Sequence, residues 1–225
     1  VDGESPGQSC AYPDPSGNKG NKIMKIATAV AGTLALAALP LAAQADDMSY
    51  RYFQAGYMES DIDNTGDTGD LDGFATRGSI GFAENFFVFT EYSSQGVDGD
   101  DGEGNDVDLT LKQLVIGLGG HYGLSENLDL VGRVGYADLT LDIDGLGIES
   151  PDESGFMVGG GLRGRIGEHV EIEGGVVYYD YNDLLDEIGG EVLVRYHFND
   201  RWALAFEYQA IDDVSTIMGG VRISF

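Results

Sequence analysis

The sequence contains a single cysteine, and this scarcity excludes several classes of protein. Cys10 is the only cysteine among 225 residues, so no disulfide framework can form within the chain. No cysteine follows the signal-like segment, where a lipoprotein would need one. Basic residues are also scarce, because 12 Lys and Arg stand against 39 Asp and Glu, for a formal net charge of −27 at pH 7. Phosphate backbones repel such a chain, so we expect no nucleic-acid partner.

Long hydrophobic runs are missing as well. The candidate for a membrane helix, Ile26–Leu39, is shorter than the roughly 20 apolar residues needed to span a bilayer. It follows Met24 and a lysine and precedes Ala43-Gln44-Ala45, the pattern of a secretory signal peptide. We therefore predict a signal peptide over residues 24–45, cleaved before Asp46. We interpret residues 1–23 as a disordered upstream leader that is foreign to the native start, and residues 46–225 as one mature domain.

The mature domain shows no helical periodicity. Apolar and polar residues alternate instead, in segments of about ten residues separated by turn residues, which is typical of β-strands in a barrel or sandwich. Ten such segments occur, at about 49–58, 73–83, 86–95, 109–122, 128–141, 155–166, 170–181, 189–198, 202–211 and 215–225.

The connections between these segments are of two kinds. Short ones begin at Glu84, Glu126, Glu168 and Asp200, each directly followed by a new strand. The others are mostly long and acidic, at 59–72, 96–108 and 142–154, with shorter ones at 182–188 and 212–214. Bacterial transmembrane barrels have short periplasmic turns and longer extracellular loops. The pattern predicts an all-β fold: one antiparallel up-and-down transmembrane β-barrel of ten strands, with eight as the alternative.

Periodicity alone does not say whether the apolar face points outward to lipid or inward to a ligand, as in a secreted soluble carrier. The placement of aromatic residues favours the outward direction. On the apolar parity, one set lies beside the short turns and a second set lies six to eight residues further along, as two interfacial girdles would. The first set is Phe82, Phe86, Tyr122, Phe198 and Trp202, and the second is Tyr92, Tyr136, Tyr178 and Tyr208.

The opposite parity contains most of the arginines. Arg77 and Glu91 lie seven residues on either side of Glu84, and Arg163 and Glu173 lie five residues on either side of Glu168. Antiparallel strands folded at these turns bring each pair to one level. Because an arginine facing lipid costs about 2 to 4 kcal/mol, we expect a lumenal charge network that plugs the barrel. Its predicted members are Arg77, Glu91, Arg133, Arg163, Glu173, Arg195, Glu207 and Arg222.

The C-terminal sequence MGGVRISF ends in Gly220, Ile223 and Phe225 at the positions of a Gly-x-x-apolar-x-aromatic pattern. With the signal peptide and the ten segments, residues 46–225 resemble the small outer-membrane β-barrels, including the OmpA-like transmembrane domain and OmpX-type proteins. The resemblance implies that the barrel-assembly machinery recognises this terminal motif. Met218 departs from the pattern, where a polar residue is usual. This architecture serves adhesins, stabilisers, narrow pores and a few enzymes, so it implies no single activity.

Catalytic residues are not evident. The three histidines, His121, His169 and His197, each lie at a strand end near a short turn, where we expect them to be solvated. None has the acidic or serine partners that barrel proteases or lipid deacylases require. We therefore predict no enzymatic activity and no cofactor.

The first acidic loop is the candidate for metal binding. Its sequence DIDNTGDTGDLD approaches a calcium-loop pattern but has a weak fifth residue and no Glu at the twelfth. A specific metal site is therefore not predicted. Weak, shared binding of divalent cations near lipopolysaccharide phosphates is the alternative, through Asp61, Asp63, Asp72, Asp98 and Asp100.

The function predicted from the sequence is an integral outer-membrane barrel of a Gram-negative bacterium, exported through the periplasm. We expect a structural and surface-interaction role, with a narrow ion or solute channel gated by the same charges as the alternative. The third hypothesis is the secreted soluble carrier. The expected partners are outer-membrane lipid, lipopolysaccharide, divalent cations and the barrel-assembly machinery, and the barrel is expected to be a monomer.

Overall fold

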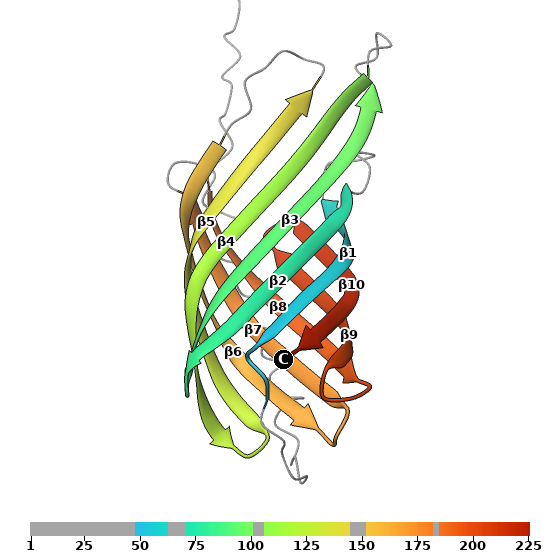
Figure 1. Cartoon of the computed structure of the whole chain (residues 1–225). Coiled ribbons are helices and arrows are strands. Elements are labelled where there is room, and N and C mark those ends of the chain that lie inside the picture. The colour runs from blue at the N-terminus through green and yellow to red at the C-terminus, as the bar shows by residue number, and fades with distance from the viewer. Residues whose placement is uncertain (1–47, 63–70, 101–105, 145–151, 182–184) are drawn as a thin grey trace, which may run out of the picture.

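The chain forms ten antiparallel β-strands (Figure 1). The computed structural model describes residues 48–62, 71–100, 106–144, 152–181 and 185–225. No helix among these residues is long and apolar enough to cross a membrane. The strands are β1 (Tyr52–Ile62), β2 (Leu71–Ala83), β3 (Phe86–Asp100), β4 (Asp106–Ser125), β5 (Leu128–Asp144), β6 (Asp152–Ile166), β7 (Val170–Tyr181), β8 (Leu185–His197), β9 (Trp202–Ile211) and β10 (Val214–Ser224).

The strands close into one barrel. Each pairs with its neighbours in the chain, and β1 pairs with β10 from Tyr52↔Ser224 to Ile62↔Val214. Closure leaves no edge strand with unpaired backbone groups, which a sheet in lipid cannot tolerate. The prediction of a ten-stranded up-and-down barrel is confirmed, and the eight-stranded alternative is wrong.

The four short turns lie together at one end of the barrel, the lower end in Figure 1. At the β6–β7 turn, Gly167 has φ of 64°, a left-handed conformation that glycine adopts without strain. At the other end the strands run further than the alternation predicted. The β3–β4 ladder continues to Asp100↔Asp106, so most of the predicted loop 96–108 is strand. A hairpin whose two faces both meet water can pair through backbone hydrogen bonds alone. It needs no alternation of apolar and polar residues, so alternation did not predict this part of the ladder.

The first strand also differs from its prediction, because β1 begins at Tyr52 rather than at residue 49. The pairing of β1 with both neighbours begins at Tyr52, which lies opposite Ser224 of β10 and Ser79 of β2. Before this point the chain turns into the barrel mouth, where Tyr50 is buried.

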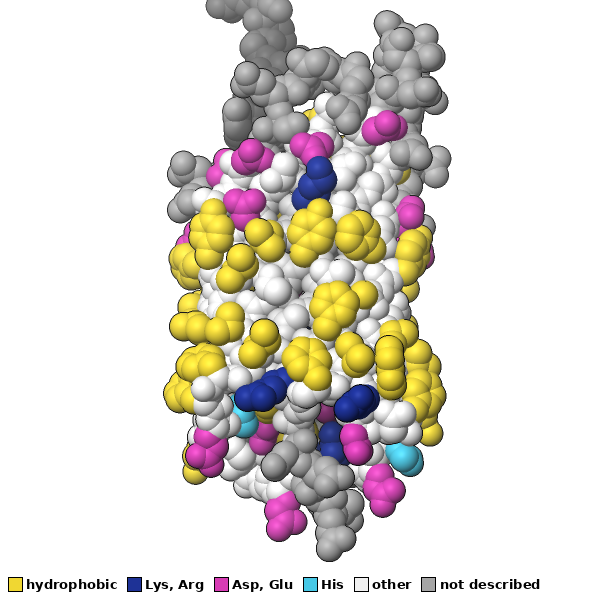
Figure 2. All heavy atoms as spheres, viewed as in Figure 1, with side chains coloured by type: hydrophobic (Ala, Val, Ile, Leu, Met, Phe, Trp, Pro, Cys, Tyr) yellow, Lys and Arg dark blue, Asp and Glu magenta, His cyan; other side chains and the backbone are white. Residues whose placement is uncertain are grey.

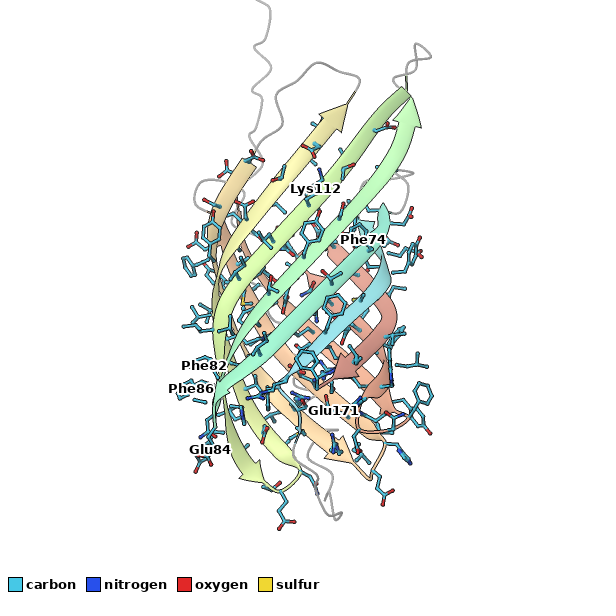
Figure 3. The ribbon with its side chains drawn as sticks, in the orientation of Figure 1. Phe74, Phe82, Glu84, Phe86, Lys112 and Glu171 are labelled. Atoms are coloured by element: carbon cyan, nitrogen blue, oxygen red, sulfur yellow. The ribbon has the colours of Figure 1, made fainter. Side chains whose placement is uncertain are left out.

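On the face shown in Figure 2, apolar side chains form two bands on the outside of the wall, and most acidic side chains lie beyond them towards the ends. Phe82 and Phe86 project outward near the short turns, and Phe74 projects outward towards the other end (Figure 3). Because the apolar face is outside and the charged face inside, the arrangement is that of a membrane barrel and not of a soluble carrier. The exposed members of the two girdles include Tyr57, Phe74, Phe82, Phe86, Tyr122, Tyr136, Phe156, Phe198, Trp202 and Tyr208.

Candidate functional site in the barrel lumen

Strand alternation and register bring the charged side chains into the lumen. The two predicted cross-strand alignments are present, since Arg77 lies opposite Glu91 and Arg163 lies opposite Glu173. The charges separate along the barrel axis into two groups. We call them the turn-side cluster, near the short turns, and the loop-side cluster, one step further along.

The loop-side cluster consists of Arg77, Glu91, Arg133, Glu191 and Glu207. Arg77 Nη2 is 2.5 Å from Glu207 Oε1, and its Nε is 3.9 Å from Glu91 Oε2. Arg133 Nη1 lies 3.0 Å from Glu91 Oε1, and its Nη2 binds Glu191. The two arginines are therefore linked through Glu91 and span β2, β3, β5, β8 and β9.

The turn-side cluster is organised around Glu171, which is fully buried. Arg163 donates two parallel hydrogen bonds of 3.0 Å to its carboxylate. Arg195 Nη1 bridges Glu171 at 2.6 Å and Glu173 at 2.9 Å. Further groups approach Glu171: Arg165 Nη2 at 4.0 Å, Arg222 Nη1 at 3.9 Å and His197 Nε2 at 3.5 Å.

Burial determines how these charges contribute to stability. Removing two charges from water is costly, and their attraction compensates for it only with good geometry and additional hydrogen bonds. Removing one partner of a buried pair leaves the other uncompensated and costs about 3 to 5 kcal/mol. The clusters therefore fix how the strands close around the lumen.

All eight residues predicted for the charge network face the lumen and lie in one of the two clusters. The partners differ from those expected, however. Arg163 binds Glu171 rather than Glu173 directly opposite, and Glu173 binds Arg195. Sequence reasoning missed Glu171, Glu191, Arg165 and His197 as members.

The histidines also depart from the prediction. His197 is 8% exposed and faces Glu171, and His121 Nδ1 lies 3.4 Å from Asp129 Oδ2 inside the barrel mouth. The expectation that they are solvated is wrong for these two, because both have the inward parity of their strands. His169, in the β6–β7 turn, is exposed as expected.

Aromatic side chains of β3 pack inside the lumen against the inner face of β4. Phe87 and Phe89 are buried, and each lies over a glycine of β4. A Cβ at Gly119 would lie 2.2 Å from the Phe87 ring, and one at Gly117 would lie 2.7 Å from the Phe89 ring. The paired glycines give these rings the space to turn inward.

Above the loop-side cluster, a cavity of about 40 Å³ is lined by Arg77, Glu207 and other residues, and this volume is room for ordered water.

The residues of the predicted terminal motif lie at the barrel seam. Ile223 pairs with Phe53, and Gly220 faces Gly56 so closely that a Cβ on Gly220 would lie 2.4 Å from a β1 carbonyl oxygen. Phe225 is 66% exposed, and its N–H donates to the Arg51 carbonyl at 3.1 Å.

The acidic residues considered for cation binding are only partly visible. Asp61 lies in β1 and Asp72 in β2, both exposed, so the ends of the calcium-like sequence are strand residues. Asp63 is outside the described residues, as are residues 24–45, for which a signal peptide is predicted. Asp98 and Asp100 lie in β3, but their side chains are not described. Within the described part of the chain, no group of three or more His, Cys, Asp or Glu could hold a metal ion.

A closed antiparallel barrel with an apolar exterior and a paired-charge interior defines the class of outer-membrane β-barrels. Within this class, the chain belongs to the family described as outer membrane protein beta-barrel domain, which its sequence matches over residues 31–192. A search of curated proteins found no match.

Solved structures of similar shape are also small barrels. Ail of Yersinia pestis is 16% identical, with 79% of this chain and 100% of that chain covered and a TM-score of 0.45. The KdgM porin is 14% identical, with coverages of 76% and 99% and a TM-score of 0.46. OprG from Pseudomonas aeruginosa is 14% identical, with coverages of 79% and 97% and a TM-score of 0.42. Scores this low support no inference about function, so the assignment rests on the sequence match.

Proposed function

We propose that this chain is a non-conducting structural barrel of the Gram-negative outer membrane, with its lumen closed by the two charge clusters. The observation that supports closure most strongly is the Arg163–Glu171 pair. A fully buried carboxylate accepts two guanidinium hydrogen bonds of 3.0 Å inside the lumen, near the short turns. Barrels of about this strand number have interiors that side chains nearly fill.

The competing function is a narrow ion or solute channel, and the same clusters would then serve as its gate. Proteoliposomes loaded with potassium ions distinguish the two. We expect the purified barrel to release potassium no faster than protein-free liposomes. Release that scales with the amount of folded barrel would contradict the closed lumen.

We propose a surface role for the carboxylates that face outward beyond the second girdle. Glu59 and Asp72 lie directly opposite each other on β1 and β2, and Asp138 and Asp180 each follow a girdle tyrosine by two residues. Like charges directly opposite on a sheet are destabilising. Divalent cations that bridge these carboxylates to lipopolysaccharide phosphates would relieve that repulsion.

Lipopolysaccharide binding with calcium or with a chelator tests this surface role. We expect calcium to increase binding and the double substitution Glu59→Gln with Asp72→Asn to weaken the increase. Asp200→Asn, at an exposed turn of the opposite end, is the matched control and should leave it intact. Binding that is indifferent to calcium would refute the role. We also propose that the barrel-assembly machinery is a partner during biogenesis and that the folded barrel is a monomer.

A further inference from the structure

The segment Met48–Arg51 lies inside the turn-side mouth of the barrel and precedes β1. Its main buried element is Tyr50, which is 9% exposed and belongs to the same apolar cluster as Phe87 and Phe89. Sequence alternation predicted a strand here, so the lumenal position has to be explained by the contacts that the segment makes.

The Tyr50 side chain is held on all sides. Its ring stacks on His121 with centroids 3.9 Å apart and on Phe87 at 5.1 Å. The Arg163 guanidinium lies over the same ring at 4.5 Å. The hydroxyl donates to Asp129 Oδ2 at 2.7 Å. One side chain thus contacts β3, β4, β5 and β6 at the mouth.

The backbone of the segment is held as firmly. Ser79 Oγ of β2 donates to the Tyr50 carbonyl at 2.8 Å. The Ser49 carbonyl accepts from Arg163 Nη2 at 3.0 Å and from Arg222 Nη2 at 2.8 Å. With the side-chain contacts, six of the ten strands bind a segment that is not part of the barrel wall.

The charge balance of the turn-side cluster explains why a carbonyl is needed there. Four arginines and His197 approach the single carboxylate of Glu171. A carboxylate has about four lone-pair positions, too few for all of these donors. Within the described residues, Arg222 Nε and Nη1 have no hydrogen-bond partner. The third nitrogen of this guanidinium, Nη2, donates to the Ser49 carbonyl, which thus supplies an acceptor that Glu171 does not.

A hollow of about 510 Å³ borders the segment on one side, between Ser49, Tyr50 and Arg51 and the turn residues Asn85 and Glu126. The contacts of the segment with the lumen are side-chain and single-carbonyl contacts rather than a strand ladder. Such contacts can break without opening the barrel wall.

We propose that Met48–Arg51 is a displaceable stopper, which covers the turn-side cluster at the periplasmic mouth by placing Tyr50 over it. This inference rests on the proposed closed lumen and adds a second, reversible closure at one end. When the segment leaves, the lumen becomes accessible from the periplasmic side as far as Arg222 and Glu171. The loop-side cluster still closes the barrel beyond that point.

Thiol labelling at two depths tests the stopper. In a chain with Cys10→Ser, Ala203→Cys places a thiol between Arg222 and His197 in register, and Ala75→Cys places one at the loop-side cavity. Both alanines are buried. The folded barrel in detergent is treated with a small charged methanethiosulfonate, and heat-modifiable migration shows that each variant is folded.

We expect Tyr50→Ala to raise the labelling rate of Ala203→Cys about tenfold, because two stacking contacts, the cation–π contact with Arg163 and one hydrogen bond are lost. Labelling of Ala75→Cys should not change. Tyr179→Ala, which removes a buried aromatic beside the loop-side cavity, is the matched control and should have the reverse effect.

Two results would overturn the stopper: no change at Ala203→Cys in folded Tyr50→Ala, or an equal rise at both thiols. Potassium release from proteoliposomes of the unsubstituted barrel tests the closed lumen separately. The stopper can therefore fail while the lumen remains closed, and release by the unsubstituted barrel would refute the closed lumen whatever the labelling shows.

Discussion

Arg163 and Glu171 form a two-pronged ion pair across β6 and β7, with Nε–Oε1 and Nη2–Oε2 both at 3.0 Å. The two residues are not opposite each other in the ladder, where Glu171 faces Arg165 instead. The pair is therefore diagonal. In this position Glu171 can also accept from Arg195 of β8, and one carboxylate joins three strands.

Glu171→Gln keeps the shape of this side chain and removes its charge. We expect it to lower the free energy of unfolding by about 3 to 5 kcal/mol, because buried guanidinium groups lose their counter-charge. Urea unfolding in detergent or lipid vesicles measures the change. Glu168→Gln, in the exposed β6–β7 turn, is the matched control and should change it by less than about 0.5 kcal/mol. Equal effects would show that Glu171 is not the centre of the cluster.

Packing of Phe87 against Gly119 gives a second prediction. Gly119→Ala places a methyl group 2.2 Å from the buried ring, so the ring or the strand has to shift. We expect a loss of about 1 to 3 kcal/mol, the usual cost of overpacking. Gly132→Ala is the control, since a Cβ there meets nothing within 4 Å. A second substitution, Phe87→Leu, should recover part of the loss, and its failure to do so would argue against the ring as the cause.

The direction of the apolar face gives a third prediction. Val134 is 53% exposed on β5 between the two girdles. Val134→Arg should destabilise the barrel in a bilayer by about 2 to 4 kcal/mol, whereas Asp138→Arg, nearer the interface, should cost about 0 to 1 kcal/mol. Unfolding from lipid vesicles measures both. A smaller cost at Val134 than at Asp138 would reverse the assignment of lipid and water along this strand.

The terminal aromatic residue gives a fourth prediction, which derives from the resemblance to small outer-membrane barrels. Phe225 is exposed, and its N–H donates a backbone hydrogen bond to the Arg51 carbonyl. Phe225→Ala should therefore reduce assembly in cells and leave refolding in detergent unchanged. Phe82→Ala, a similarly exposed aromatic on β2, controls for the loss of a lipid contact. Equal assembly of the two variants would remove Phe225 from the recognition motif.

The fold was predictable because alternation and turn spacing reflect the same physical constraint. Each strand has to present an apolar face to lipid, so its period is two, and the acidic turn residues mark where each pair of strands folds. These signals also placed Arg77 opposite Glu91 and Arg163 opposite Glu173. Alternation could not show where a ladder ends, which explains the error at residues 49–51 and in the loop 96–108.

The ion-pair partners were less predictable. Register aligns Cα atoms, but an arginine reaches a diagonal carboxylate as easily as one directly opposite. Glu171 shares the inward parity of Glu173, and Glu191 shares that of Arg195, so parity was the available signal for both. The choice of Glu171 by Arg163 depends on how several guanidinium groups share the lumen, which no single strand pair determines.

The closed lumen is the central claim, and conductance in planar bilayers tests it most directly. The purified barrel should insert without producing stable unitary currents, because the paired charges of the two clusters occupy the lumen. Stable unitary currents from the unsubstituted barrel, altered in size or selectivity by Arg163→Ala, would contradict the account.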